Sequence, residues 1–115
     1  MKNKILLLPF PFDDFSAVKM RPALCLTKPI SFYNHIVVAF ISSNIPATTD
    51  ILNTDIVIKT SDLFFAQTGL KCDSVIRLHK LITIPQKIVQ RNLGTIPAEL
   101  EIVINEKLKT FLELP

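Results

Sequence analysis

The sequence predicts a mainly β fold, or α+β in schemes that count the helix. The expected architecture is a small, twisted antiparallel sheet, closed or nearly closed, with a C-terminal helix over one side. Short apolar runs rich in β-branched residues recur along the chain, and the 8 prolines separate many of them. Helical amphipathic spacing is clear only in the last part. The 115 residues suit one domain, which we expect to span 1–115.

The strands are expected where apolar or alternating residues run between turn signals. The strongest is HIVVAFIS at 35–42, which is rich in β-branched residues. A bend or bulge near His79 is expected to divide one apolar stretch into two strands. The full set of expected strands is 4–8, 23–27, 35–42, 54–59, 74–78 and 80–84.

Three helical segments are expected, and the last is the clearest. One helical turn is predicted at 61–67 with Ser61 as its N-cap, followed by a turn at Gly69. A short helix is predicted at 86–92, ending near Gly94. The last helix should begin at Pro97 with glutamates in its first turn. Its apolar face would carry Leu100, Val103, Ile104, Leu108, Phe111 and Leu112.

Charge is unevenly distributed along the chain, whose formal net charge is +3. Residues 71–96 hold five Lys and Arg against Asp73 alone, whereas residues 97–115 hold four Glu against two Lys. A basic patch would favour a polyanionic partner, although an ordinary solvated surface is the simpler alternative.

Cysteine usage and hydropathy indicate the cellular compartment in which the protein is expected. Cys25 lies in an apolar run and Cys72 near an expected turn, which suits a reduced, cytoplasmic protein. No His/Cys cluster has metal-ligand spacing, so no metal site is expected. The apolar N-terminal run is too short, and too interrupted by proline, for a signal peptide or a membrane span.

The stretch PFPFDDFSAVKMRP at 9–22 raises a functional possibility. Arg21 precedes Pro22, which favours an extended backbone, and its guanidinium could bind a phosphate through two hydrogen bonds. An exposed loop arginine is the equally simple alternative. Ser42 and Ser43 end the strongest strand, where hydroxyls could donate to an anionic oxygen or merely terminate the strand.

Four segments carry a resemblance to a known family: ILLLPFPFDDFSAVKMRPALCL, VVAFISSN, TGLKCDSVIRLHKLITI and NLGTIPAELEIVINEKLKTFL. Together they resemble the PemK-like (MazF) toxins of bacterial type II toxin–antitoxin systems. The resemblance implies a small SH3-like barrel of the PemK/MazF/CcdB type that forms homodimers. It also implies an endoribonuclease that cleaves single-stranded RNA, mRNA included, without metal or other cofactor and so inhibits translation and growth. Attack by the 2′-hydroxyl would leave 2′,3′-cyclic phosphate and 5′-hydroxyl ends.

The resemblance also assigns site residues. The family's catalytic arginine maps onto Arg21, its strand-end threonine onto Ser42, and its loop serine onto Ser16. The RNA contacts it implies are Lys19, Ser43, Asn44, Asn53, Thr54, His79 and Lys80. The family's strand-end threonine is replaced here by serine, which keeps the hydroxyl but loses the methyl that restricts its rotamer.

Partners follow from the same resemblance. A cognate antitoxin with a disordered acidic and hydrophobic tail is expected, and the toxin would bind DNA together with it. Asp13 and Asp14 lie near the expected phosphate site and should point to solvent or pair with Lys19. Two alternatives stay open, a non-catalytic toxin of the same fold that binds a protein such as DNA gyrase, and an inactive member that only binds antitoxin.

Overall fold

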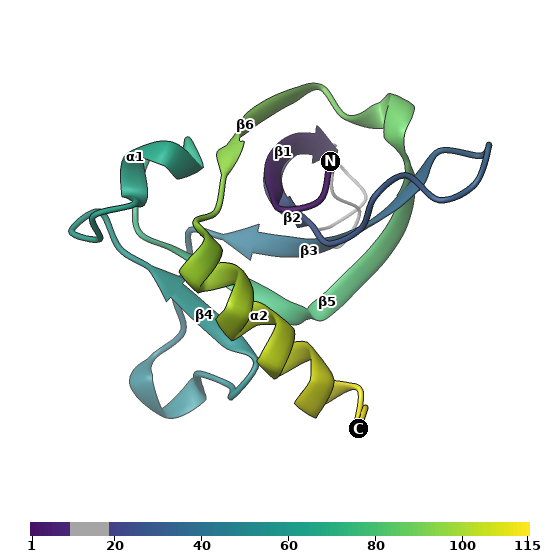
Figure 1. Cartoon of the computed structure of the whole chain (residues 1–115). Coiled ribbons are helices and arrows are strands. Elements are labelled where there is room, and N and C mark those ends of the chain that lie inside the picture. Colours follow the sequence, from purple (N-terminus) through teal and green to yellow (C-terminus); the bar gives the residue numbers. More distant parts are fainter. Residues whose placement is uncertain (10–18) are drawn as a thin grey trace.

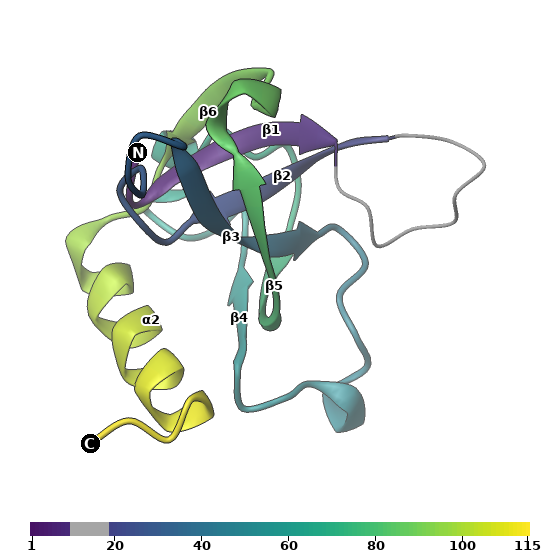
Figure 2. The same cartoon turned by 90° about the vertical axis from the view of Figure 1, so that its right-hand side faces the viewer.

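The fold is a single six-stranded antiparallel sheet that curls into a half-barrel, with a helix at the C-terminus (Figures 1 and 2). The computed structural model describes residues 1–9 and 19–115. The strands are β1 Lys4–Pro9, β2 Met20–Cys25, β3 His35–Ser42, β4 Asp55–Ile58, β5 Ser74–Pro85 and β6 Arg91–Thr95, in the order β4-β5-β3-β2-β1-β6. The helices are α1 Phe65–Thr68 and α2 Ala98–Phe111, with 3₁₀ turns η1 Thr48–Asp50 and η2 Gln86–Ile88. The expected mainly β architecture with a terminal helix is confirmed.

Apolar residues are buried on both faces of the sheet. On one face, Ile5 and Leu24 pack with Leu100 and Ile104 of α2. The residues that alternate with these along each strand point to the other face. Leu6 and the buried Cys25, for example, belong to the second cluster, inside the curl. This double burial explains why β1 and β3 read as nearly continuous apolar runs rather than as alternating ones.

The segment after β5 differs from its prediction. The short helix expected at 86–92 is wrong, because only η2 is helical and the chain then enters strand β6. That strand pairs with β1, with Leu7 opposite Arg91 and Ile5 opposite Gly94. Pairing with a strand so distant in sequence overrides the weak local helical signal.

Strand β5 is continuous, and the predicted interruption near His79 is a bulge within it. Phe40 of β3 faces Arg77, whereas its neighbour Ala39 faces Leu81. Residues 78–80 therefore have no counterparts on β3, which bends the strand.

The two glycines of the chain meet where α1 crosses β6. Gly69 ends α1 in the left-handed conformation at φ 72°, as the predicted turn requires. A Cβ on Gly94 would lie 2.2 Å from the carbonyl oxygen of Gln67, and one on Gly69 would lie 2.0 Å from that of Leu93. Only glycine allows the two backbones to approach so closely. Ser61 is not the helix cap, because α1 begins at Phe65.

Helix α2 is tied to the sheet through its first half. Its start agrees with the prediction to within one residue, since Pro97 is the N-cap. Leu100 and Ile104 are buried and Leu108 is partly buried against them. Val103, Phe111 and Leu112, expected on the same buried face, are exposed. No helix among the described residues is long and apolar enough to cross a membrane.

Candidate functional site

Strand β2 carries Arg21 to the same end of the sheet as the serines that follow β3. Arg21 lies opposite Leu8 of β1. On its other side, β2 pairs with β3 from Cys25 to Ala23, which faces Phe40. Continuing that register by two residues would set Arg21 level with Ser42. The structure thus places these two predicted residues at one end of neighbouring strands.

Arg21 lines a cavity of about 270 Å³ at this end of the half-barrel. Two further cations line it, Lys71 from the loop after α1 and Arg91 from the first position of β6. Ser43, the residue directly after β3, also lines the cavity. So do Gly69 and Leu93, which lie where the two glycines meet. The crossing of α1 over β6 therefore brings the cations together.

The described lining of this pocket is positively charged. Among the described residues that line it, none carries a carboxylate, and three are arginine or lysine. An arginine fork can hold two phosphate oxygens at once, while a lysine contributes a compact point charge. Lys71 and Arg91 appeared in the sequence only as members of a basic region. No local motif marks them, because their proximity to Arg21 depends on the crossing of α1 and β6.

The two serines after β3 have different environments. Ser42 is 8% exposed, and its Oγ accepts the backbone N–H of Asn44 at 3.0 Å. Ser43 is exposed and lines the cavity. Of these two serines, Ser43 lines the pocket, whereas Ser42 accepts the Asn44 N–H in the turn that follows β3. Asn44 is exposed beside them.

Predicted RNA contacts form a second group at the bulge of β5. Lys80 places its Nζ over the ring of Phe40, 5.2 Å from the centroid. His79 is partly buried, and its Nδ1 has no hydrogen-bond partner among the described residues. Burial lowers the pKa of His79, and the nearby positive charge of Arg77 lowers it further, so the ring is neutral near pH 7. Neither Lys80 nor His79 is among the described residues that line the Arg21 pocket.

Asn53 and Thr54 lie on the helix side of this region. With four residues of α2 they line a separate cavity of about 270 Å³, and the Asn53 carbonyl accepts Lys107 Nζ at 2.5 Å. The next residue, Asp55, pairs with Arg77 across β4 and β5. Asn53 and Thr54 therefore lie near the bulge of β5 and not beside Arg21.

The remaining predicted residues belong to the connection between β1 and β2. Lys19 is exposed directly before β2. Ser16, Asp13 and Asp14 lie outside the described residues.

Fold and pocket together define a class: a small β half-barrel with a cationic pocket that suits a phosphate. The chain belongs to the PemK-like, MazF-like toxin family of type II toxin–antitoxin systems, whose model matches residues 2–112.

Solved structures support the fold assignment. The chain is similar to Mycobacterium tuberculosis toxin MazF-mt6, with a TM-score of 0.73, 23% sequence identity, and coverage of 97% of this chain and 98% of that chain. It is also similar to an endoribonuclease from Mycobacterial species, solved in complex with its cognate antitoxin. There the TM-score is 0.69 at 16% identity, with 100% of this chain and 96% of that chain covered. No curated protein matches the chain in sequence.

Proposed function

We propose that this toxin is an endoribonuclease that cleaves single-stranded RNA, including mRNA, without a metal ion. The observation that carries the proposal is the pocket that joins Arg21, Lys71 and Arg91 with the Ser43 hydroxyl. Family membership supports it, as does similarity to a protein described as an endoribonuclease. Single-stranded RNA is the preferred substrate because its bases are free to contact protein side chains.

The reaction is an internal transesterification. The ribose 2′-oxygen attacks the adjacent phosphorus, forming an O2′–P bond while the P–O5′ bond breaks. The 2′-hydroxyl loses its proton and the departing 5′-oxygen gains one, which gives a 2′,3′-cyclic phosphate and a 5′-hydroxyl. The phosphorus centre carries additional negative charge in the transition state, so fixed positive charge around it accelerates the step.

The pocket residues divide this work. Arg21 neutralises the phosphorane and assists proton transfer to or from it. Lys71 and Arg91 bind the same or a neighbouring phosphate, and Ser43 donates to a phosphate oxygen. Ser42 acts in the family's strand-end position, here through the turn that it forms with Asn44. We retain Ser16 as a further hydroxyl that holds a phosphate oxygen or orients Arg21.

Base contacts would lie along the sheet from this pocket. His79 and Lys80 at the bulge, with Asn53 and Thr54 beside it, would read bases on one side of the cleavage point. A neutral His79 can both donate and accept a hydrogen bond to a base edge. Lys19 and Asn44 adjoin the pocket and would contact the backbone of the bound strand.

The proposal extends to partners. An antitoxin with an acidic, hydrophobic tail would occupy the RNA-binding surface, where the cations attract it. The toxin would act in the cytoplasm as a homodimer and bind DNA together with its antitoxin.

A cleavage assay tests the proposal directly. Purified protein is incubated with mixed-sequence RNA in EDTA, and the product ends are identified by mass spectrometry. We expect cyclic phosphate ends, and a loss of about 100-fold or more in rate for Arg21→Ala, because one anion-stabilising group is removed. Arg21→Lys should retain part of the activity through its charge.

Lys59→Ala is the matched control, because Lys59 is an exposed cation directly after β4 that does not line the pocket. It should cleave like the unmodified protein. A protein that arrests growth without cutting RNA would refute the nuclease and favour the non-catalytic binder. Full activity of Arg21→Ala would remove Arg21 from the mechanism.

A further inference from the structure

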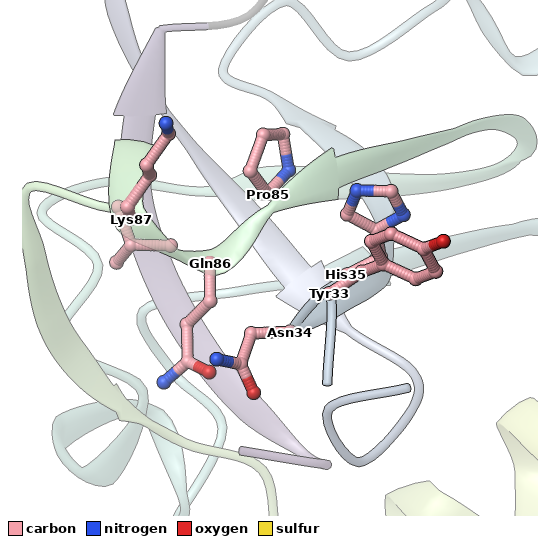
Figure 3. Close-up of a pocket in the computed structure, with 7 residues that line it drawn as sticks. Tyr33, Asn34, His35, Pro85, Gln86 and Lys87 are labelled. Atoms are coloured by element: carbon pink, nitrogen blue, oxygen red, sulfur yellow. The ribbon is translucent and has the colours of Figure 1, made fainter. Parts of the chain in front are cut away.

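A larger cavity, of about 610 Å³, lies at the other end of β3. His35 and Ser42 mark the two ends of this strand, roughly 23 Å apart at ~3.3 Å per residue. Its walls come from the turn before β3 and from the segment where β5 passes into η2 (Figure 3). None of the residues discussed for RNA cleavage lines it.

The turn at this cavity holds two aromatic side chains in solvent. Its backbone is fixed by hydrogen bonds from Ile30 N–H to the His35 carbonyl (2.8 Å) and from Asn34 N–H to the Ser31 carbonyl (3.2 Å). Phe32 and Tyr33 occupy the tip and are 83% and 64% exposed. Packing within the chain therefore does not account for these rings.

The Tyr33 and His35 rings are stacked, and the Phe32 ring is tilted against Tyr33. The Tyr33 and His35 rings lie 5.6 Å apart between centroids and 24° from parallel, and Phe32 lies 4.4 Å from Tyr33. Figure 3 shows the Tyr33 ring beside that of His35 on one side of the cavity. A partly exposed flat surface of this kind accepts a planar ligand by stacking.

Polar groups complete the cavity. The Gln86 N–H donates to the Asn34 carbonyl at 2.8 Å, which fixes η2 against the turn. The side-chain amides of Asn34 and Gln86 both extend to the side away from the rings (Figure 3). Lys87 adds an exposed positive charge, and no carboxylate is among the described lining residues. Amides can pair with the edge of a base, and lysine can pair with a phosphate.

We propose that this cavity is a second RNA subsite, which holds one unpaired base of the bound strand by stacking on Tyr33 and His35. The inference rests on the proposed function for its choice of ligand. Lys87 contacts the adjoining phosphate, and the Asn34 and Gln86 amides, which extend away from the rings, contact the next nucleotide along the strand. A base held here lies about the length of β3 away from the cleavage pocket, so the subsite strengthens binding of longer RNAs and not of the shortest cleavable ones.

The test uses the whole chain and a ligand that cannot be cleaved. A 2′-O-methyl RNA on the order of ten nucleotides long, which lacks the attacking hydroxyl, is titrated into isotope-labelled protein and followed by NMR. Backbone amides of residues 33–35 and 86–87 should shift. Adenosine monophosphate should shift the same amides, whereas inorganic phosphate should leave those of residues 33–35 unchanged.

Tyr33→Ala should weaken binding of the oligonucleotide about tenfold, since one stacked base is lost. Tyr33→Phe is the matched control, because it keeps the ring and should keep the affinity. Light scattering measures the molar mass of Tyr33→Ala and hence its oligomeric state. A change of oligomeric state would show that this surface binds a second copy, and would overturn the RNA subsite.

The inference and the proposed function can fail separately. Cleavage of RNA with shifts confined to the Arg21 pocket, or an unchanged Kd for Tyr33→Ala, would refute the subsite and leave the nuclease intact. Shifts at residues 33–35 in a protein that does not cleave RNA would support the subsite and refute the nuclease.

Discussion

The ion pair between Asp55 and Arg77 joins β4 to β5 next to the bulge. Arg77 Nε lies 2.8 Å from Asp55 Oδ1, and the Asp55 side chain is fully buried, whereas that of Arg77 is 19% exposed. Asp55 Oδ2 also accepts the N–H of Leu52 at 2.9 Å. Removing one partner of such a pair leaves the other charge in a poor environment. Asp55 is therefore a structural anchor for the region that carries His79.

Asp55→Asn should destabilise the protein by about 3 kcal/mol, because Arg77 loses its countercharge and one buried contact of the carboxylate is lost. Urea unfolding monitored by circular dichroism measures the change. Asp50→Asn is the matched control, because Asp50 is an exposed carboxylate in η1. Equal midpoints for the two variants would show that the ion pair contributes nothing.

The same variant has a second readout in the titration of His79. Burial and Arg77 lower the pKa of His79, while Asp55 acts in the opposite direction. Removing the Asp55 charge should lower this pKa further, which NMR of the imidazole protons detects. Because the folded pKa lies below the ordinary 6.5, His79 contributes stability in full above pH 6.5. That contribution is lost as pH falls through the folded pKa, and an unchanged pKa in the variant would contradict this assignment.

Among the elements, α1 and β6 control the shape of the cationic pocket. They meet at Gly69, which ends α1, and at Gly94 of β6, and the pocket is lined by the residues directly after α1 and by Arg91 and Leu93 of β6. Gly94→Ala would place a Cβ 2.2 Å from the Gln67 carbonyl oxygen, a backbone atom that cannot rotate away. The two elements must separate, and Arg91 and Lys71 separate with them.

We expect Gly94→Ala to cost about 2 kcal/mol and to lower the Tm by about 8 °C. RNA cleavage should fall as well, measured at a temperature where the variant is folded. Asn92→Ala, an exposed position in the same strand, should change neither. A fully stable Gly94→Ala variant would mean that the close approach of α1 and β6 is not required.

Strands β3 and β6 show which elements could be predicted from the sequence and which depend on distant contacts. Strand β3 was predicted with its observed bounds, because HIVVAFIS combines β-branched residues with burial on both faces. Strand β6 was not predicted, and the helix expected at 86–92 overlapped its first two residues, because its identity depends on pairing with β1 and on the contact of Gly94 with α1. The family resemblance assigned Arg21 and Ser42 to one site, and the structure places them at one end of the neighbouring strands β2 and β3. Lys71 and Arg91 could not be assigned to that site, since long-range contacts bring them there.

In the molecule as a whole, a carboxylate attaches the C-terminal helix at one end of the sheet, and cations gather at the other end. Glu101 at the start of α2 accepts the Asn3 side-chain amide at 2.7 Å and lies 4.0 Å from Lys2, so it helps attach the helix to the N-terminus. The pocket at the opposite end of β1 and β2 gathers cations without a described carboxylate in its wall. A net charge of only +3 therefore conceals a local excess of positive charge.

That local excess predicts how binding depends on salt. Each phosphate that a cation neutralises on a single strand contributes about −0.7 to the slope of log Kobs against log salt concentration. If Arg91 binds one phosphate, Arg91→Ala should weaken binding of 2′-O-methyl RNA and make the slope less steep by about 0.7. Fluorescence anisotropy across a series of salt concentrations measures both quantities.

Lys59→Ala again provides the comparison, because it removes the same formal charge from an exposed position outside the pocket. If the field of the whole molecule steered RNA without a defined phosphate site, the two variants would lose similar affinity. If the pocket is the site, only Arg91→Ala changes the slope by the value of one neutralised phosphate. The slope separates these outcomes because it counts displaced counterions, whereas a loss of affinity alone would also follow from a local change in β6.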